Sequence, residues 1–328
     1  GINALFSNTL GSYNTANGAG ALFINSTGFQ NTAIGYEALF YNKTGDNNTA
    51  TGIWALSRNT TGNANTANGC MALDFNQTGN NNTATGNLAL SRNTTGNANT
   101  ANGNWALQNN ETGNYNTATG NKALYSNTTG IFNTAIGSEA LQDNEIGNYN
   151  TAIGNQSGPR YSYLNNTGAF GYNALTLTDN QYRIGNSSVT SIGGYASWTN
   201  LSDARFKFNV SEDIKGLDFV MRLRPVTYQM DVNKLADFLC ENKKFDEESK
   251  SMVTAFPDEF TRKSREEKSQ IRYTGFIAQE VEQAAREIGY DFSGVDAPQN
   301  EHSHYGLRYA EFVVPLVKAV QEQQQMIN

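Results

Sequence analysis

The sequence has little of what stabilises most small secreted domains, and nothing that spans a membrane as a helix. Its 328 residues include only two cysteines, Cys70 and Cys240, which excludes a disulfide scaffold and argues against a cysteine-based metal site. No hydrophobic run approaches the ~18 residues of a membrane helix. Positive charge is scarce, since 23 Lys and Arg face 30 Asp and Glu. A general nucleic-acid binder needs a basic surface, so we expect no nucleic-acid partner. Because no hydrophobic run is long enough, we also expect no membrane insertion.

Charge and proline are missing mainly from the first part of the chain. Residues 1–200 contain 6 Lys or Arg and 8 Asp or Glu, against 17 and 22 in residues 201–328. Asparagine shows the reverse, with 40 of 45 before residue 201, and the first proline is Pro159. This step in composition predicts a domain boundary near residue 200. The predicted parts are a repeat region, a junction and a C-terminal domain, at 1–181, 182–201 and 202–328.

A repeat with a period of 17 residues fills the first part. Asn-Thr-Ala recurs from Asn14 to Asn150, a glycine follows each Ala by two residues, and Ala-Leu recurs with leucines from Leu5 to Leu141. Helical repeats need about 33 residues, so this period predicts a mostly β solenoid, a parallel β-roll. We expect two short strands and two tight turns per coil, with the turns supplied by glycine and asparagine, which tolerate positive φ.

Within each coil the strands are predicted at Thr-Ala-x and around Ala-Leu. One leucine and one alanine per coil are expected to form inward ladders, and the repeated asparagines to hydrogen-bond to the next coil. One coil buries so little that, at ~25 cal/mol per Å², burial barely offsets the entropy of ordering it. Association of several chains is expected to supply the missing burial. Gly1 falls on the glycine position of the repeat, which suggests that further coils precede it.

One form of the repeat resembles a known family. Asn-Thr-Ala-Ile-Gly, at 31–35, 133–137 and 150–154, is similar to the repeat in the head domains of trimeric autotransporter adhesins, whose unit is shorter. That resemblance implies a parallel β-roll packed as a three-fold bundle, and therefore a homotrimer.

Four separated motifs follow the junction. The first three are S-D-A-R-F-K at 202–207, L-R-P-V-T-Y at 223–228 and G-F-I-A-Q-E-V at 275–281. The fourth is Y-G-L-R-Y at 305–309, followed by P-L-V-K-A-V-Q-E at 315–322. In this order and spacing they resemble the C-terminal intramolecular chaperone domain of phage tail spikes and fibres, the endosialidase type, over about 202–328. The resemblance implies an α+β domain. We expect it to end in a helix from Phe312 to Ile327 and to carry a charged insertion at 232–270.

The resemblance also implies self-cleavage. In that family the serine that begins the domain cuts the peptide bond on its own N-terminal side, assisted by a lysine five residues later. Ser202 is then the nucleophile, Lys207 its partner, and the cut falls between Leu201 and Ser202. A lysine can act as the base once burial lowers its pKa. Five residues place two side chains ~140° apart on a helix and on opposite faces of a strand, so the pair needs a turn between them or a neighbouring chain.

Five other motif residues are assigned to structure. Asp203 and Arg205 are expected to form an ion pair, and Gly275, Gln279 and Glu280 belong to the third motif. Taken without the motifs, the Ser-Asp pair at 202–203 would indicate a helix N-cap.

The functional alternatives are three. The first is a trimeric fibre or adhesin tip of a phage or phage-tail-like particle, or an adhesin of a bacterial surface. It is expected to be extracellular, to bind a surface glycan or protein, and to be matured by its own chaperone. The second is part of a glycan-degrading tail spike, although the eight acidic residues of the roll are scattered rather than set in a repeated carboxylate pair. The third is an ice- or crystal-binding solenoid, suggested by the threonine ladder from Thr15 to Thr151. No cofactor is predicted, and the histidines at 302 and 304 are expected to be solvated rather than bound to a metal.

Overall fold

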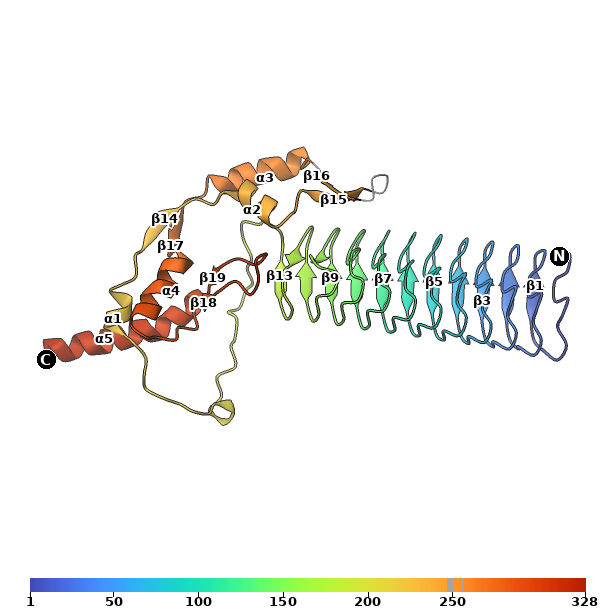
Figure 1. The fold of residues 1–328 in the computed structure, drawn as a ribbon, viewed down its shortest axis with the longest axis horizontal. Helices are drawn as coiled ribbons and strands as arrows, with labels where there is room; N and C mark the ends of the chain where they lie inside the picture. The colour runs from blue at the N-terminus through green and yellow to red at the C-terminus, as the bar shows by residue number, and fades with distance from the viewer. Residues whose placement is uncertain (247–250, 255) are drawn as a thin grey trace. The chain divides into compact units, whose positions relative to one another are not determined.

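The chain folds as two compact units, Gly1–Asn186 and Ser187–Asn328. A computed structural model describes residues 1–246, 251–254 and 256–328. The first unit is the predicted parallel β-solenoid and the second is a small α+β domain that ends in a helix (Figure 1).

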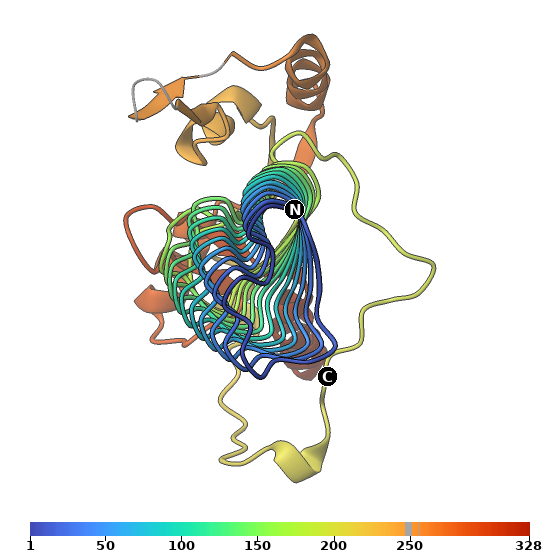
Figure 2. The same cartoon turned by 90° about the vertical axis from the view of Figure 1, so that its right-hand side faces the viewer.

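One short strand from each coil builds the solenoid sheet, in which eleven strands run parallel. Each alanine lies opposite the alanine of the next coil, as Ala50 lies opposite Ala67, so the coils stack in register (Figure 2). The strands are β1 (Thr15–Asn17), β2 (Thr32–Ile34), β3 (Thr49–Thr51), β4 (Thr66–Asn68), β5 (Thr83–Thr85), β6 (Thr100–Asn102), β7 (Thr117–Thr119), β8 (Thr134–Ile136), β9 (Thr151–Ile153), β11 (Gly168–Phe170) and β13 (Tyr182–Ile184).

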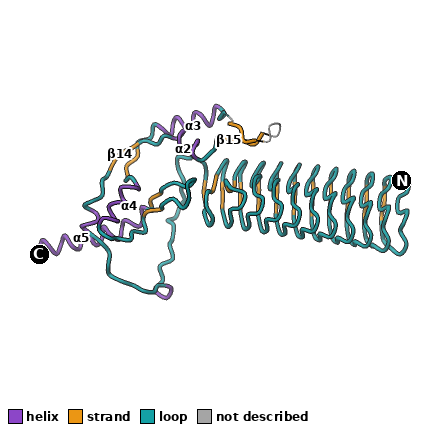
Figure 3. The backbone as a smooth tube through the Cα atoms, in the orientation of Figure 1, coloured by secondary structure: helices purple, strands orange, loops and turns teal. Residues whose placement is uncertain are grey.

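The second strand predicted around Ala-Leu is wrong for most coils, where this segment forms turns (Figure 3). Its leucine has a positive φ, as at Leu56 with +49°, and one left-handed residue interrupts the extended backbone of a strand. Within residues 1–186 the segment becomes a strand only near the end, where β10 (Gly158–Pro159) pairs in parallel with β12 (Leu175–Thr176).

Each regular coil buries one leucine, two alanines and two asparagines. Ala50, Ala55 and Leu56 are fully buried in one coil, and the equivalent residues of the other coils continue these ladders through a single core. The inward leucine and alanine ladders are therefore confirmed, with a second alanine per coil.

The two buried asparagines of each coil satisfy the interior of the turns, while exposed asparagines such as Asn47 and Asn81 supply a positive φ there. In the first asparagine ladder, Asn59 Nδ2 donates to Asn42 Oδ1 at 2.7 Å and to the Gly62 carbonyl at 2.9 Å. In the second, the Asn65 backbone N–H and Nδ2 contact Asn48 Oδ1 at 3.0 and 3.2 Å. Asn48 Nδ2 in turn donates to Gly62 O at 2.9 Å, so both ladders converge on one carbonyl. Buried amides paired in this way avoid the cost of unsatisfied polar groups.

Close stacking explains the two repeated glycines. A Cβ on Gly62 would lie 2.4 Å from the Gly79 carbonyl oxygen, and one on Gly52 would lie 2.4 Å from Gly69 O. Gly52 also has a φ of +134°, which L side chains rarely adopt.

The solenoid sheet extends beyond residue 181, the end expected from the repeat. β13 pairs with β11, with Tyr182 opposite Gly168 and Ile184 opposite Phe170. The motif is hard to recognise there because this last step is 14 residues instead of 17.

The second unit alternates short helices and two-stranded sheets. Its elements are η1 (Ala204–Phe206), α1 (Leu217–Val220), β14 (Val226–Tyr228), α2 (Val232–Phe238), β15 (Lys243–Asp246), β16 (Ser251–Thr254), α3 (Glu259–Ser269), β17 (Tyr273–Gly275), α4 (Ala278–Glu287), β18 (Val295–Asp296), β19 (Gly306–Leu307), η2 (Tyr309–Phe312) and α5 (Val313–Ile327). Antiparallel pairs join β14 to β17, β15 to β16 and β18 to β19.

A small core contains Phe219, Val281, Phe292 and Phe312, and Leu223, Phe276 and Leu307 of the second, third and fourth motifs pack against it. The helix expected at the end of the chain is α5. The insertion expected at 232–270 contains α2, β15, β16 and α3, and five of its residues lie outside the described ranges. No helix within those ranges is long and apolar enough to cross a membrane.

Candidate self-cleavage site

The structure brings together the serine and the lysine predicted for self-cleavage. Lys207 Nζ donates a hydrogen bond to Ser202 Oγ at 2.8 Å. The 3₁₀ turn η1 lies between the two residues, so the turn that their spacing demands is present within one chain. A regular helix or strand would point these side chains away from each other.

Asp203 and Arg205 hold this turn in place. The Asp203 carboxylate caps η1 by accepting the Arg205 backbone N–H at 2.9 Å. It also forms an ion pair with the Arg205 guanidinium, with Nη2 2.6 Å from Oδ2. These hydrogen bonds lower the pKa of Asp203 and raise the pKa of Arg205. The N-cap role therefore belongs to Asp203, which leaves the Ser202 hydroxyl to Lys207.

The site is open to solvent in a single chain. Ser202 and Lys207 are exposed, and Leu201, before the predicted cut, is 81% exposed. Phe206 and Phe208 beside the lysine are exposed as well. A lysine accepts the serine proton only in its neutral form, which burial favours. One chain thus supplies the geometry of the pair but not the dry surroundings that the chemistry needs.

The second and third motifs lie side by side and form one framework, joined by a strand pair and an ion pair. Val226 of β14 lies opposite Gly275 of β17 in the antiparallel pair. Arg224 and Glu280 add a two-pronged ion pair, with Nη2 2.5 Å from Oε1 and Nε 3.0 Å from Oε2. The Arg224 guanidinium holds the pKa of Glu280 below its ordinary value.

Gly275 makes room for the fourth motif. A Cβ at this position would lie 2.2 Å from the Tyr309 hydroxyl oxygen, which accepts the Phe276 backbone N–H at 3.2 Å. Gln279 lies exposed in the first turn of α4. Of the predicted motif residues, the structure places Gly275 and Glu280 in this framework and Ser202, Asp203, Arg205 and Lys207 around η1.

Comparison with known families decides what these motifs belong to. Residues 202–290 match the family described as "Chaperone of endosialidase". The resemblance predicted from the motifs is thereby confirmed over these residues. The match begins at Ser202 and ends before Tyr305, so the last motif and α5 lie outside it, although Phe312 packs in the same core. No curated protein and no solved structure matches the chain.

A parallel β-solenoid followed by a chaperone domain of this family fits a phage tail fibre or tail spike. The match covers 202–290 and says nothing of the 17-residue repeat, which rests on the sequence and the structure.

Replacing Glu280 with glutamine is expected to lower the melting temperature of the chaperone domain at neutral pH but not in acid. The lowered pKa of Glu280 means that the fold favours the carboxylate, so the stabilisation is complete above the ordinary glutamate pKa and disappears as pH falls through the lowered one. The effect is expected to be small because both side chains are substantially exposed. Thermal unfolding across a pH series measures it, with the exposed Glu212→Gln as control. Melting curves that remain apart in acid would contradict the assignment.

The described residues contain no group of three His, Cys, Asp or Glu arranged to hold a metal ion. His302 Nε2 lies 3.2 Å from Glu301 Oε1, and His304 Nδ1 lies 3.0 Å from the Tyr305 carbonyl. Cys70 and Cys240 are free thiols.

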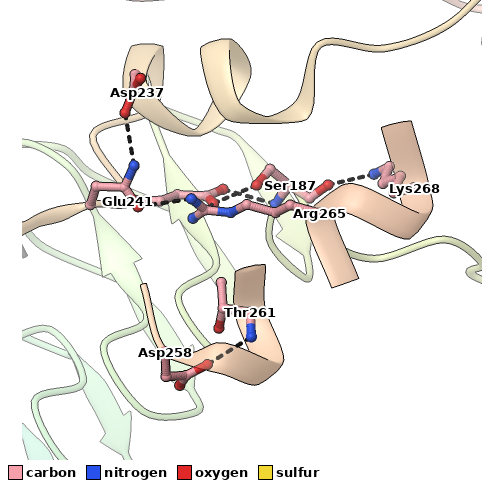
Figure 4. A network of polar contacts seen from close by, with 8 residues as sticks. Ser187, Asp237, Glu241, Asp258, Thr261, Arg265 and Lys268 are labelled. Atoms are coloured by element: carbon pink, nitrogen blue, oxygen red, sulfur yellow. Dashed lines mark hydrogen bonds and ion pairs between the residues drawn. The ribbon is translucent and has the colours of Figure 1, made fainter. Parts of the chain in front are cut away.

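One polar cluster was not predicted from the sequence. Glu241 and Arg265, which lie within the charged insertion, form a buried ion pair that also holds Ser187 (Figure 4). No sequence signal could have found it, because a charged insertion is ordinarily interpreted as solvated surface.

Proposed function

We propose that the chain forms the tip of a homotrimeric fibre or adhesin of a phage or phage-tail-like particle, which attaches outside the cell to a surface glycan or protein. Its chaperone domain sets the register of the trimer and then cleaves the chain between Leu201 and Ser202. The observation that carries this proposal is the 2.8 Å hydrogen bond from Lys207 Nζ to Ser202 Oγ, at the first residues of the family match.

The proposed reaction acts only on the chain itself. Neutral Lys207 accepts the hydroxyl proton of Ser202 while Oγ attacks the carbonyl carbon of Leu201. The peptide C–N bond breaks and the Ser202 nitrogen takes up a proton, which leaves an ester between Leu201 and Ser202 Oγ. Water then hydrolyses the ester to a Leu201 carboxylate and a free serine with a new N-terminus.

The repeats give the chaperone its task. The coils have nearly identical inward residues, so chains shifted by one 17-residue coil lose only their end contacts. Pairing of such uniform surfaces specifies register weakly. A non-repetitive domain that assembles first would align the three chains, and its removal would leave a solenoid whose persistence depends on slow unfolding.

Helix α5 has an exposed apolar side that supports the proposal of a trimer. One side packs on its own unit, where Ala319 is buried and Glu322 Oε2 accepts the Leu217 backbone N–H at 2.7 Å. Its other side is an apolar stripe whose residues, separated by three or four positions or multiples of a turn, are between 48% and 75% exposed. The stripe consists of Val313, Leu316, Val317, Val320 and Ile327. This spacing suits a short bundle of helices from several copies of the chain.

Replacing Val320 with aspartate is expected to convert the trimer to monomers, because the charge would have to be buried in the bundle. Native mass spectrometry of the full chain measures the change. The matched control is Gln325→Asp, an exposed position outside the stripe. If cleavage needs the dry surroundings of the assembled trimer, Val320→Asp also stays uncut. A trimeric Val320→Asp variant would contradict the role of the stripe.

The threonine ladder supports a second candidate, binding to ice or another crystal. Thr49, Thr66 and Thr83 are exposed and pair in register along the sheet, at the ~4.8 Å spacing of neighbouring strands. Thermal hysteresis of the full chain tests it, and a trimer that buries the ladder would exclude it. Glycan-array binding measured alongside sugar release separates attachment from the glycan-degrading alternative.

A further inference from the structure

A buried polar cluster lies between the charged insertion and the segment that follows the solenoid (Figure 4). At its centre Arg265 Nη2 of α3 lies 3.2 Å from Glu241 Oε2, and the two side chains are only 3% and 1% exposed. Arg265 Nη1 also donates to Asn242 Oδ1 at 2.8 Å. An isolated ion pair of this kind is costly to bury, so its other hydrogen-bond partners matter.

The segment before the cleavage site supplies those partners. Ser187 donates to Glu241 twice, from Oγ to Oε2 at 2.5 Å and from its backbone N–H to Oε1 at 2.8 Å. Lys268, one turn after Arg265 in α3, donates to the carbonyls of Ser187 at 2.6 Å and Val189 at 2.7 Å. The residues 187–189 are therefore held through both N–H and C=O groups by charged side chains, which make the stronger class of hydrogen bond.

After this anchored segment the chain is exposed as far as the proposed cut. Ser187 is buried, whereas residues 190–201 are all exposed. Twelve exposed residues thus separate the anchored segment from Ser202.

We propose that this cluster is a clamp that holds the chaperone domain on the solenoid after the cut. The inference rests on the proposed cleavage between Leu201 and Ser202. That cut divides the clamp, since Ser187 and Val189 stay with the solenoid product while Glu241, Arg265 and Lys268 belong to the cleaved domain. The clamp's partner is the C-terminal tail of the cut solenoid, which it holds at residues 187–189. Cleavage then makes release possible without causing it at once.

The test makes the cut independently of the chain's own chemistry. A Ser202→Ala chain with an N-terminal affinity tag carries the recognition sequence of a site-specific protease after Leu201, in the exposed segment. After proteolysis the tagged solenoid is immobilised and the loss of the C-terminal fragment is followed over time. Lys268→Met and Ser187→Ala are each expected to speed this loss about tenfold or more, as charged hydrogen bonds are lost. Lys263→Met, an exposed lysine of the same helix, is expected to match the parent.

Two results would overturn the clamp: a nicked parent that loses its domain as fast as Lys268→Met does, or variants that both retain it as long as the parent. Ser187→Ala alters only the solenoid tail, so its result does not depend on the folding of the cleaved domain. Because the protease makes the cut, failure of self-cleavage in the unmodified chain would leave this measurement unaffected.

Discussion

The Ser202→Ala chain remains a single 328-residue polypeptide under conditions in which the unmodified chain yields two fragments split at Leu201 and Ser202. This is the expected result because the substitution removes the only atom, Oγ, that attacks the Leu201 carbonyl. Loss of a nucleophile typically lowers a rate by a factor on the order of 10³ or more. Intact mass under denaturing conditions distinguishes one chain from two fragments without ambiguity.

Matched controls separate chemistry from folding. Ser211→Ala removes another exposed serine, which bonds to Asp213 at 2.8 Å, and is expected to cut normally. Lys207→Arg keeps the charge but cannot become a neutral base, so it should stay whole, while Lys215→Met should cut. Cleavage of Ser202→Ala at the same bond would refute the assignment. If the unmodified chain also stays whole, its native mass decides between an unassembled trimer and a domain that remains as a permanent cap.

The second large effect is expected inside the solenoid, where Asn82→Asp should strongly lower the urea concentration at half unfolding. Asn82 is fully buried, and its Nδ2 donates to Asn65 Oδ1 at 3.1 Å and to the Gly96 carbonyl at 2.9 Å. Aspartate would replace these donors with oxygen atoms that face other acceptors. The cost is about 3–5 kcal/mol, that of leaving a buried charge without a partner.

The neighbouring residue provides the control for this ladder. Asn81 is exposed and has a φ of +58°, a conformation that aspartate also tolerates. Asn81→Asp should therefore be half unfolded at a urea concentration close to that of the wild type. Asn82→Ala should fall between the two, at about 1–3 kcal/mol, because it leaves acceptors unpaired without adding a charge. Equal stability of Asn81→Asp and Asn82→Asp would show that the ladder does not hold the coils together.

The period of 17 was by itself sufficient to determine the solenoid, its parallel register and the inward Leu and Ala ladders. Strict repetition places equivalent residues in equivalent surroundings, so one coil determines the rest. The asparagine contacts to the next coil followed from the same logic. The motifs likewise predicted the start of the family match at Ser202, and the spacing of Ser202 and Lys207 required the turn that η1 supplies.

Other features were decided only by the tertiary structure. The segment around Leu56 could be extended or left-handed on local grounds, since the two differ by only about 1–2 kcal/mol per residue, and contacts with neighbouring coils decide between them. β13 joins the sheet after a step of 14 instead of 17 residues because its backbone pairs with β11, although the repeat motif has ended. The Glu241–Arg265 pair forms because folding buries charges that the sequence places in a polar insertion, and such charges must find partners when water is removed.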